Sequence, residues 1–280
     1  MKMYRLLMKR PLDFFCAIGS LVILSPVFLI FAVLGKINTG AVFYKQHRVG
    51  KGGKVFVLYK FQSMTNKKDE YGNLLPDKMR LHKYGKFIRA TSIDELPQLF
   101  NIIKGNMSFI GPRPKDVKEA VFHVDKQFKR YDVRPGITGL AQVSDRNNIT
   151  FDVQSVYDNK YAMRVTFWGD FLIILKTIAV VFCKKGIDRS AQKPAMDDFH
   201  VGGNYWGDVL LSQGAITKLE YDKRVAFSKT LKVGDIMPSL DKQRQMESAG
   251  TLTVAASVLG KGLERVAVEV SSSGADNDKT

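Results

Sequence analysis

The stretch FFCAIGSLVILSPVFLIFAVL, residues 14–34, contains no charged side chain. As an α-helix it would reach about 30 Å, the thickness of the hydrocarbon core of a bilayer. Pro26 interrupts it near the middle, because a proline there removes the hydrogen bond to the carbonyl of Val22 and clashes with that turn. Ser25 can bond back to the freed backbone, as kinked membrane helices require. The run therefore predicts two apolar helical halves that meet at a Ser25-Pro26 break.

Basic side chains flank the apolar run on both sides: Lys2, Arg5, Lys9 and Arg10 before it, and Lys36, Lys45, Arg48, Lys51 and Lys54 after it. Short segments rich in Lys and Arg stay on the cytoplasmic face, so both flanks favour the same side. A helix that enters the membrane, bends and returns satisfies both, and we prefer this re-entrant arrangement. A kinked helix that spans the membrane is the alternative. Asp13, at the edge of the run, is expected to cap the helix or to neutralise Arg10.

The chain of 280 residues carries a formal net charge of +16. The whole excess lies in residues 1–190, since residues 191–280 carry no net positive charge. The first two-thirds should therefore meet an anionic partner, such as phosphates, phospholipid head groups or nucleic acid.

Hydrophobic periodicity and turn residues predict an α/β fold that is mostly α. We expect an N-terminal re-entrant helix-break-helix (residues 1–36), a small membrane-associated domain (37–190) and a partly disordered C-terminal extension (191–280). Residues 271–280 have the composition of a disordered end. Within the middle part we expect a short β-hairpin and amphipathic surface helices: strands over 42–44 and 55–61 around the basic, Gly-rich turn 48–54, and helices over 116–131, 155–162 and 167–182.

Residues 89–114 read RATSIDELPQLFNIIKGNMSFIGPRP and place two adjacent carboxylates, Asp94 and Glu95, in a basic neighbourhood. One interpretation is structural, because Ser92-x-x-Glu95 fits a capping box. Pro97 argues against it, since a helix more naturally begins near a proline, which puts the carboxylate pair at a helix N-terminus that also suits phosphate. A Mg²⁺ ion shared by carboxylate and diphosphate oxygens would place an acid beside a phosphate without repulsion.

Two rigid turns follow the carboxylate pair. Gly111–Pro114 (GPRP) displays one guanidinium, that of Arg113, and Arg binds phosphate through a planar fork. The second turn, RPGITG over residues 134–139, leads into LAQVSDRN and could offer backbone N–H groups to an anion. Both turns could equally be plain connectors.

The order KRPLD, LSP, VFYKQHRVGKGGKVFVLYKFQSM, SIDELPQLFNIIKGNMSFIGPRP and RPGITGLAQVSDRN resembles the bacterial sugar transferase family, the monotopic phosphoglycosyl transferases. The resemblance covers about residues 9–190. It implies a re-entrant helix broken at Ser25-Pro26 and a catalytic domain half-sunk in one leaflet, on the cytoplasmic face of the bacterial inner membrane. Residues after about 195 lie outside it and receive no predicted function.

The resemblance also implies roles for individual residues. Asp94 would be the nucleophile, and Glu95 would assist by binding metal or handling a proton, with Mg²⁺ as cofactor held by both. The implied phosphate contacts are Lys60, Arg89 and Arg113, and a weaker signal for the nucleotide-sugar loop falls on Arg134, Thr138, Gln142 and Arg146. The chain departs from the family at Gln62 and Asp145, where Arg and Gly are common.

The implied reaction moves a sugar 1-phosphate from a UDP-sugar to undecaprenyl phosphate, releases UMP and passes through an aspartyl phosphosugar. It would be the first membrane step in making O-antigen, capsule, exopolysaccharide or glycoprotein glycan. Expected partners besides the substrates are inner-membrane lipids, downstream glycosyltransferases and a second copy in a homodimer.

Two alternatives to this reaction stay open. One is a different enzyme of lipid-linked sugars, such as a glycosyltransferase that uses direct displacement. The other is a membrane-tethered protein that binds anionic lipid or nucleic acid. We expect no nucleic acid, because such binders interleave aromatic stacking positions with basic ones, whereas Tyr44, Tyr59 and Phe61 alternate like a strand core.

Overall fold

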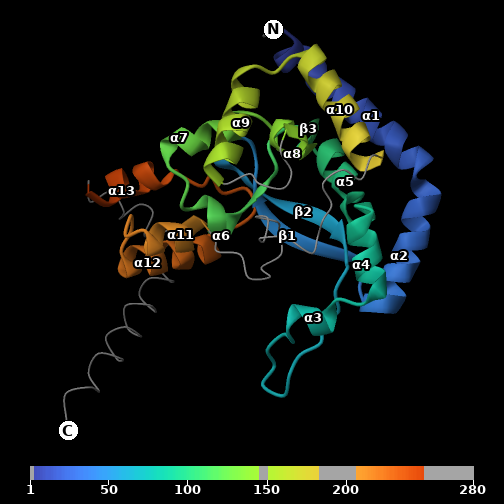
Figure 1. The fold of residues 1–280 in the computed structure, drawn as a ribbon, viewed down its shortest axis with the longest axis horizontal. Coiled ribbons are helices and arrows are strands. Elements are labelled where there is room, and N and C mark those ends of the chain that lie inside the picture. Colours follow the sequence, from blue (N-terminus) through green and yellow to red (C-terminus); the bar gives the residue numbers. More distant parts are fainter. Residues whose placement is uncertain (1–2, 145–150, 183–205, 249–280) are drawn as a thin grey trace.

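The computed structural model describes residues 3–144, 151–182 and 206–248, and shows a mostly helical α/β fold with two small sheets (Figure 1). Its elements in chain order are η1 (Tyr4–Met8), α1 (Lys9–Ile23), α2 (Ser25–Thr39), β1 (Phe43–Val49), η2 (Lys51–Gly53), β2 (Val55–Phe61), α3 (Asp77–Arg80), α4 (Lys83–Ala90), η3 (Ile93–Glu95), α5 (Gln98–Ile103), β3 (Ser108–Ile110), β4 (Lys115–Asp116), α6 (Val117–Ala120), α7 (Asp125–Phe128), η4 (Lys129–Asp132), β5 (Gly136–Thr138), α8 (Leu140–Ser144), α9 (Phe151–Met163), α10 (Phe167–Phe182), α11 (Trp206–Ser212), α12 (Lys218–Thr230) and α13 (Leu240–Ser248). The expected fold class and the expected short hairpin are confirmed.

The hairpin of β1 and β2 forms the centre of the larger sheet. The two strands pair antiparallel in a register that runs from Phe43 opposite Phe61 to Val49 opposite Val55, and β4 adds to the other edge of β1. The smaller sheet pairs β3 with β5 in parallel. The predicted helices over 155–162 and 167–182 correspond to α9 and α10.

The apolar run folds as two helices that break where the sequence predicts. α1 ends at Ile23, α2 begins at Ser25, and the Ser25 hydroxyl donates to the carbonyl of Val22 at 2.8 Å, which is the carbonyl that Pro26 leaves without its amide partner. Among the described residues, no single helix is long and apolar enough to cross a bilayer. Tyr4–Ile23 and Ser25–Thr39 meet that criterion only together, as a pair bent by 67°.

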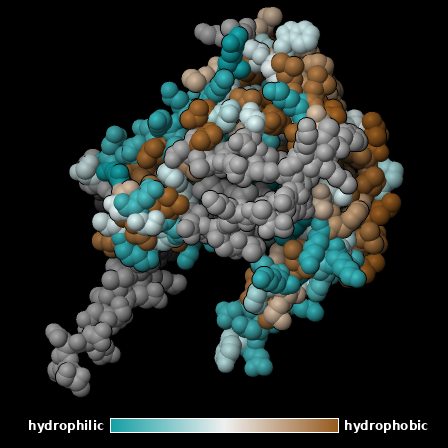
Figure 2. All heavy atoms as spheres, in the orientation of Figure 1, coloured by the Kyte–Doolittle hydropathy of each residue, from teal (hydrophilic) through white to brown (hydrophobic). Residues whose placement is uncertain are grey.

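Large apolar side chains cover the outer surface of this bent pair, where the space-filling view is brown along one edge of the molecule (Figure 2). Phe15, Val22 and Leu29 are each 68% exposed. The helix α10 adds a second set of exposed apolar side chains, which includes Trp168 at 70%. Apolar surface of this extent on neighbouring helices requires a covering medium or partner.

The inner surface of the pair is attached to the domain through α5. Ala17 of α1 lies in one buried cluster with Phe56, Leu99 and Ile102. Arg10 donates to the carbonyls of Ile102 and Ile103 at 2.6 and 2.8 Å, and so satisfies two carbonyls at the C-terminal end of α5.

The expected role of Asp13 as a helix cap is wrong. α1 begins four residues earlier, at Lys9, and continues the helical turns of η1, so Asp13 lies inside the helix. Its carboxylate is buried and accepts a hydrogen bond from the backbone amide of Phe109 at 3.3 Å. Asp13 therefore ties α1 to β3.

The amphipathic helix predicted over 116–131 is also wrong as a continuous element. Residues 121–124 interrupt it, so that the segment forms β4, α6, α7 and η4. The interruption buries His123 completely, where its Nδ1 lies 3.0 Å from the hydroxyl of Tyr131 and its backbone carbonyl accepts from the amide of Leu240. A contact with a residue more than a hundred positions away thus overrides the local helical period.

The helices α11, α12 and α13 pack on the same domain as the hairpin. Ile216, Leu231 and Met237 share a buried cluster with Val55 and Phe122. The segment before α13 also pairs with the start of β2: the amide of Val55 donates to the carbonyl of Asp235, the amide of Gly234 to that of Val55, and the amide of Met237 to that of Gly53, at 2.9 to 3.0 Å. The expected disordered end, residues 271–280, lies outside the described residues.

Candidate active site

The carboxylate pair lies in the short turn η3, immediately before α5. Pro97 is the residue that precedes α5, so the helix begins near the proline, as predicted. Ser92 has a left-handed backbone (φ 58°), and its side chain forms no capping hydrogen bond to η3. The residue before α5 is Pro97, so the capping-box interpretation does not hold. Asp94 is 4% exposed, whereas Glu95 is half-buried beside it.

Three cations from β2, α4 and the GPRP turn approach this pair. Lys60 of β2 places its Nζ 3.4 Å from Oε1 of Glu95, and the guanidinium of Arg113 lies 2.9 Å from the same oxygen. Arg89 of α4 also contributes positive charge at Asp94. The structure therefore gathers around Asp94 and Glu95 the phosphate contacts that the family resemblance implies.

Close helix packing brings Arg89 to this position. α4 approaches the strand end after β2 so closely that a Cβ added to Gly85 would lie 1.9 Å from the carbonyl oxygen of Ser63. Only a glycine allows this approach. Nε of Arg89 then donates to the hydroxyl of Ser63 at 2.9 Å, which orients the guanidinium.

Burial raises the pKa of Asp94 to about 6, which is the largest effect on this group. Lys60 opposes the shift, the charge of Glu95 adds to it, and Arg89 and Arg113 oppose it more weakly. A carboxylate that is desolvated yet surrounded by cations is a strong nucleophile or base near neutral pH.

The raised pKa predicts a pH-dependent difference in stability between the wild type and the Asp94→Asn variant. Because the folded-state pKa lies above the unfolded value, the wild type loses stability as pH rises from about 4 to about 6, and the variant does not. Above pH 6 the free energy of unfolding of the variant should therefore be equal to that of the wild type or larger, by up to about 3 kcal/mol. Its melting temperature should be the same or higher. Thermal melts in detergent with a metal chelator, between pH 4 and 8, measure this difference, and a variant that melts lower than the wild type at pH 7 contradicts it.

The two Gly-rich turns pack directly on each other. A Cβ on Gly111 would lie 2.3 Å from the carbonyl oxygen of Arg134, and one on Gly139 would lie 2.2 Å from that of Gly111. Hydrogen bonds join the turns, from the amide of Gly111 to the carbonyl of Thr138 and from the amide of Gly136 to that of Pro112, both at 2.9 Å. The spacing of these glycines in the sequence thus reflects one backbone-to-backbone contact that carries Arg113.

Gly111→Ala should lower the melting temperature and the turnover together. The new methyl group meets backbone atoms that cannot move aside, so β3 and β5 must separate, at a cost of about 1–3 kcal/mol. Gly19→Ala in α1 is the matched control, because a Cβ there meets nothing within 4 Å. A thermal melt of both variants checks this, and equal melting temperatures for Gly111→Ala and wild type would contradict the close packing.

The described residues of the predicted nucleotide-sugar loop lie in the second Gly-rich turn and in α8, which follows it. Arg134 donates through Nε to the carbonyl of Gly105 at 2.8 Å, beyond the end of α5 opposite the carboxylate pair, and burial lowers its pKa. The hydroxyl of Thr138 is 2.9 Å from that of Thr177 in α10. Gln142 lies in α8, next to the contact between the two turns, and Arg146 lies outside the described residues. Their proposed role stays a prediction.

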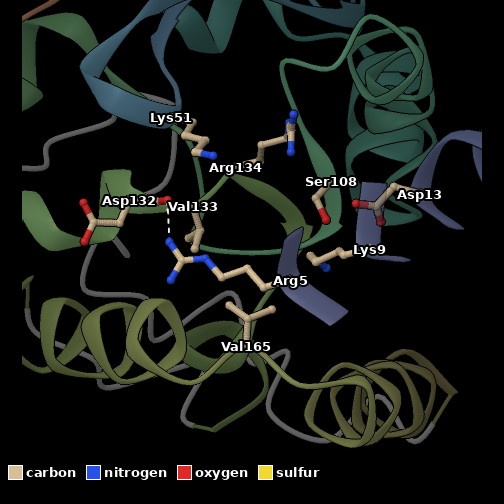
Figure 3. Close-up of a pocket in the computed structure, with 9 residues that line it drawn as sticks. All are labelled: Arg5, Lys9, Asp13, Lys51, Ser108, Asp132, Val133, Arg134 and Val165. Carbon is tan, nitrogen blue, oxygen red and sulfur yellow. Dashed lines mark hydrogen bonds between the residues drawn. The ribbon is translucent and has the colours of Figure 1, made fainter. Parts of the chain in front are cut away.

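Arg134 faces a hollow where α1 begins, together with Arg5, Lys9 and Lys51 (Figure 3). Arg5 donates to the backbone carbonyl of Asp132 at 2.9 Å, the bond drawn in Figure 3.

Asp170 of α10 holds the start of α1 beside this hollow. It accepts from Lys9 at 2.6 Å, from the hydroxyl of Tyr4 at 2.8 Å and from that of Tyr161 at 2.9 Å. Sequence reasoning missed this acceptor, because no local pattern connects residue 170 with the N-terminus.

The departure at Gln62 has a structural explanation. Gln62 is 5% exposed, and its amide donates to the carbonyl of Met64 at 2.7 Å and to Oδ1 of Asn66 at 3.2 Å. The side chain therefore stabilises the chain where it leaves β2. Asp145, the second departure, lies outside the described residues.

Among the described residues, no three His, Cys, Asp or Glu side chains group as a ready metal centre. Two adjacent carboxylates still fit Mg²⁺, which takes one or two protein carboxylates and fills its remaining positions with substrate phosphates and water. Burial is the main cause of the raised pKa of Asp94, and a cation bound to that carboxylate would favour its ionised form.

The fold and the site together define a class of protein: a domain attached to a bent apolar helix pair, with a buried carboxylate in a cationic site suited to phosphate chemistry. Residues 4–184 match the bacterial sugar transferase family, and the chain belongs to that family. The predicted family is confirmed.

Three relatives illustrate the similarity. The chain is 41% identical over 186 residues to the uncharacterized sugar transferase EpsL of Bacillus subtilis, which covers 66% of this chain and 92% of EpsL. It is 37% identical over 196 residues to the undecaprenyl-phosphate galactose phosphotransferase of Salmonella typhimurium, covering 64% of this chain and 41% of the relative. It is 38% identical over 185 residues to the UDP-N-acetylgalactosamine-undecaprenyl-phosphate N-acetylgalactosaminephosphotransferase of Aeromonas hydrophila, covering 62% and 43%. The chain thus spans less than half the length of the last two.

Proposed function

We propose that this chain transfers a sugar 1-phosphate from a UDP-sugar to undecaprenyl phosphate and releases UMP. The observation that carries the proposal is the buried Asp94, with its raised pKa, next to Glu95 and within a ring of three cations. The names of the Salmonella and Aeromonas relatives support undecaprenyl phosphate as the acceptor, and the Aeromonas name supports a UDP-sugar as the donor. The product would serve assembly of a surface polysaccharide or glycoprotein glycan.

The reaction divides into two displacements at one phosphorus. A carboxylate oxygen of Asp94 attacks the phosphorus that bears the sugar, and the bond from that phosphorus to the UMP oxygen breaks, so that the electron pair leaves with UMP. An oxygen of undecaprenyl phosphate then attacks the same phosphorus, and the bond to Asp94 breaks, which restores the carboxylate. The cations Lys60, Arg89 and Arg113 would hold the diphosphate and offset charge on the leaving UMP.

Glu95 already binds Lys60 and Arg113, so we propose that it orients them and joins Asp94 in holding Mg²⁺. The ion would neutralise diphosphate charge beside the two carboxylates.

We also propose that the bent helix pair inserts into one leaflet of the bacterial inner membrane, with both ends on the cytoplasmic face. The 67° bend and the exposed apolar surface support insertion, and the basic residues on both flanks support a common face. A re-entrant pair would place the carboxylate site beside the head groups, where the phosphate of a polyprenyl carrier lies. Downstream glycosyltransferases and a second copy of the chain would then meet it in the plane of the membrane.

The experiment that tests the function measures UMP release from a panel of UDP-sugars, with undecaprenyl phosphate and Mg²⁺, by wild type and Asp94→Asn. Omission of undecaprenyl phosphate distinguishes the covalent route from direct displacement. A covalent intermediate releases up to one UMP per chain and leaves a phosphosugar on Asp94, detectable as added mass on its peptide. Direct displacement releases no UMP without acceptor, and absence of UMP with every donor would contradict the proposal.

A further inference from the structure

Side chains from distant elements bind three backbone carbonyls, one just before the GPRP turn and two within it. The carbonyl of Ile110 accepts from the hydroxyl of Tyr161 at 2.9 Å, that of Arg113 from Arg130 at 2.9 Å, and that of Pro114 from Arg48 at 3.2 Å. The carbonyl of Pro112, which lies between these residues, accepts from the amide of Gly136. Groups from four separate places in the chain thus set the backbone on both sides of Arg113.

Arg130 is the group that binds the carbonyl of Arg113 itself. It lies in η4, is 2% exposed, and forms an ion pair with Asp158 of α9 at 2.8 Å, in which both side chains are 1% exposed. A buried ion pair contributes little to stability by comparison with apolar side chains of the same size. The two contacts share one end of the guanidinium, because the same Nη2 of Arg130 lies 2.8 Å from Asp158 and donates to the carbonyl of Arg113 at 2.9 Å.

Arg113 is therefore held at both ends. Its carbonyl is bonded to Arg130, and its guanidinium reaches Oε1 of Glu95 at 2.9 Å. A long side chain on a mobile turn would lose conformational entropy whenever it bound a phosphate, whereas one with a fixed backbone has lost part of it already.

We propose that Arg130, paired with Asp158, is a positioning residue for Arg113 and thereby sets the affinity of the site for the diphosphate of the donor. This inference rests on the proposed function, because it assigns Arg113 to that diphosphate. Loss of the hydrogen bond from a charged group to the Arg113 carbonyl should weaken donor binding about tenfold.

The test replaces the whole ion pair with apolar side chains, as Arg130→Met/Asp158→Leu, because removal of one partner alone would leave a buried charge. The control is Arg224→Met/Glu220→Leu, which removes an arginine–acid pair in α12, whose arginine is 4% exposed, together with the ion pair of Glu220 with Arg244. We expect the donor KM to rise about tenfold in the first variant with kcat within about twofold, and no such rise in the control. Arg113→Ala should then raise KM far less in the Arg130→Met/Asp158→Leu background than in the wild type, because both changes act through one group.

Donor affinity is also measured without turnover, by titrating UDP-sugar into Asp94→Asn with and without the double replacement. Wild type that binds the donor but releases no UMP would refute the proposed function and leave the positioning role testable by this titration. The positioning role would be overturned if Asp94→Asn binds the donor equally well with and without the double replacement. It would also be overturned if Arg113→Ala raises KM by the same factor in the wild type and in Arg130→Met/Asp158→Leu. If the double variant fails to fold, Arg130→Lys is tested in its place. Lysine keeps the charge beside Asp158 but lacks the planar fork of arginine. An unchanged donor KM in Arg130→Lys would then overturn the proposal.

Discussion

Asp94→Asn should reduce UMP release by about 10³-fold or more at neutral pH. The amide has almost the same shape as the carboxylate but supplies no anionic oxygen to attack phosphorus, so the covalent step has no nucleophile. The loss should appear in kcat, with little change in donor KM, because Lys60 and Arg113 remain in place. Initial-rate measurements with saturating donor and acceptor check this expectation.

The variant also carries its own control for folding. Because burial disfavours the Asp94 carboxylate, the asparagine variant should remain folded and associated with membranes, with a melting temperature no lower than that of wild type. Asp69→Asn, in an exposed loop, is the matched substitution elsewhere and should leave turnover unchanged. Normal turnover in Asp94→Asn would refute Asp94 as the nucleophile.

A chain that ends at residue 205 should lose at least 10 °C in melting temperature or fail to stay soluble in detergent. Removal of α11–α13 takes Ile216, Leu231 and Met237 out of the buried cluster and exposes Val55 and Phe122. Each large apolar side chain that loses its burial costs about 1.5–3 kcal/mol, and the sum is comparable with the whole stability of an ordinary domain, about 5–15 kcal/mol.

A chain that ends at residue 248 is the control for this truncation, since it keeps α11–α13 and all their contacts. The comparison matters because the alignment with EpsL covers 92% of that relative but only 66% of this chain, and the family match ends at residue 184. Equal melting temperatures for the two truncations would show that the extension is an appendage rather than part of the domain core.

Features that depend on neighbouring residues were predictable from the sequence. Pro26 and Ser25 act within one helical turn, so the break and its hydrogen bond to Val22 appear where expected. The hairpin and α10 follow from alternation, glycine positions and helical period over short windows.

Features that depend on residues far apart in the chain could not be predicted from the sequence. The helical period over 116–131 is real, yet contacts with α13 and Tyr131 bury His123 and interrupt the helix. Asp13 reads as a cap locally but accepts from Phe109, and the hydrogen bond from Arg134 to Gly105 does not follow from its motif. No window of sequence contains both partners of these contacts.

The sequence by itself determined the family and the bent apolar helix pair, and it predicted Asp94, Glu95, Lys60, Arg89 and Arg113 as candidate site residues, because residue order and composition carry this information. The tertiary structure alone decided how these groups behave. It buries Asp94 and raises its pKa, brings cations from β2, α4 and the GPRP turn to one place, and joins that turn to Arg130 by a hydrogen bond. Desolvation and charge–charge interactions depend on distances in space between residues far apart in the chain, and those distances exist only once the chain has folded.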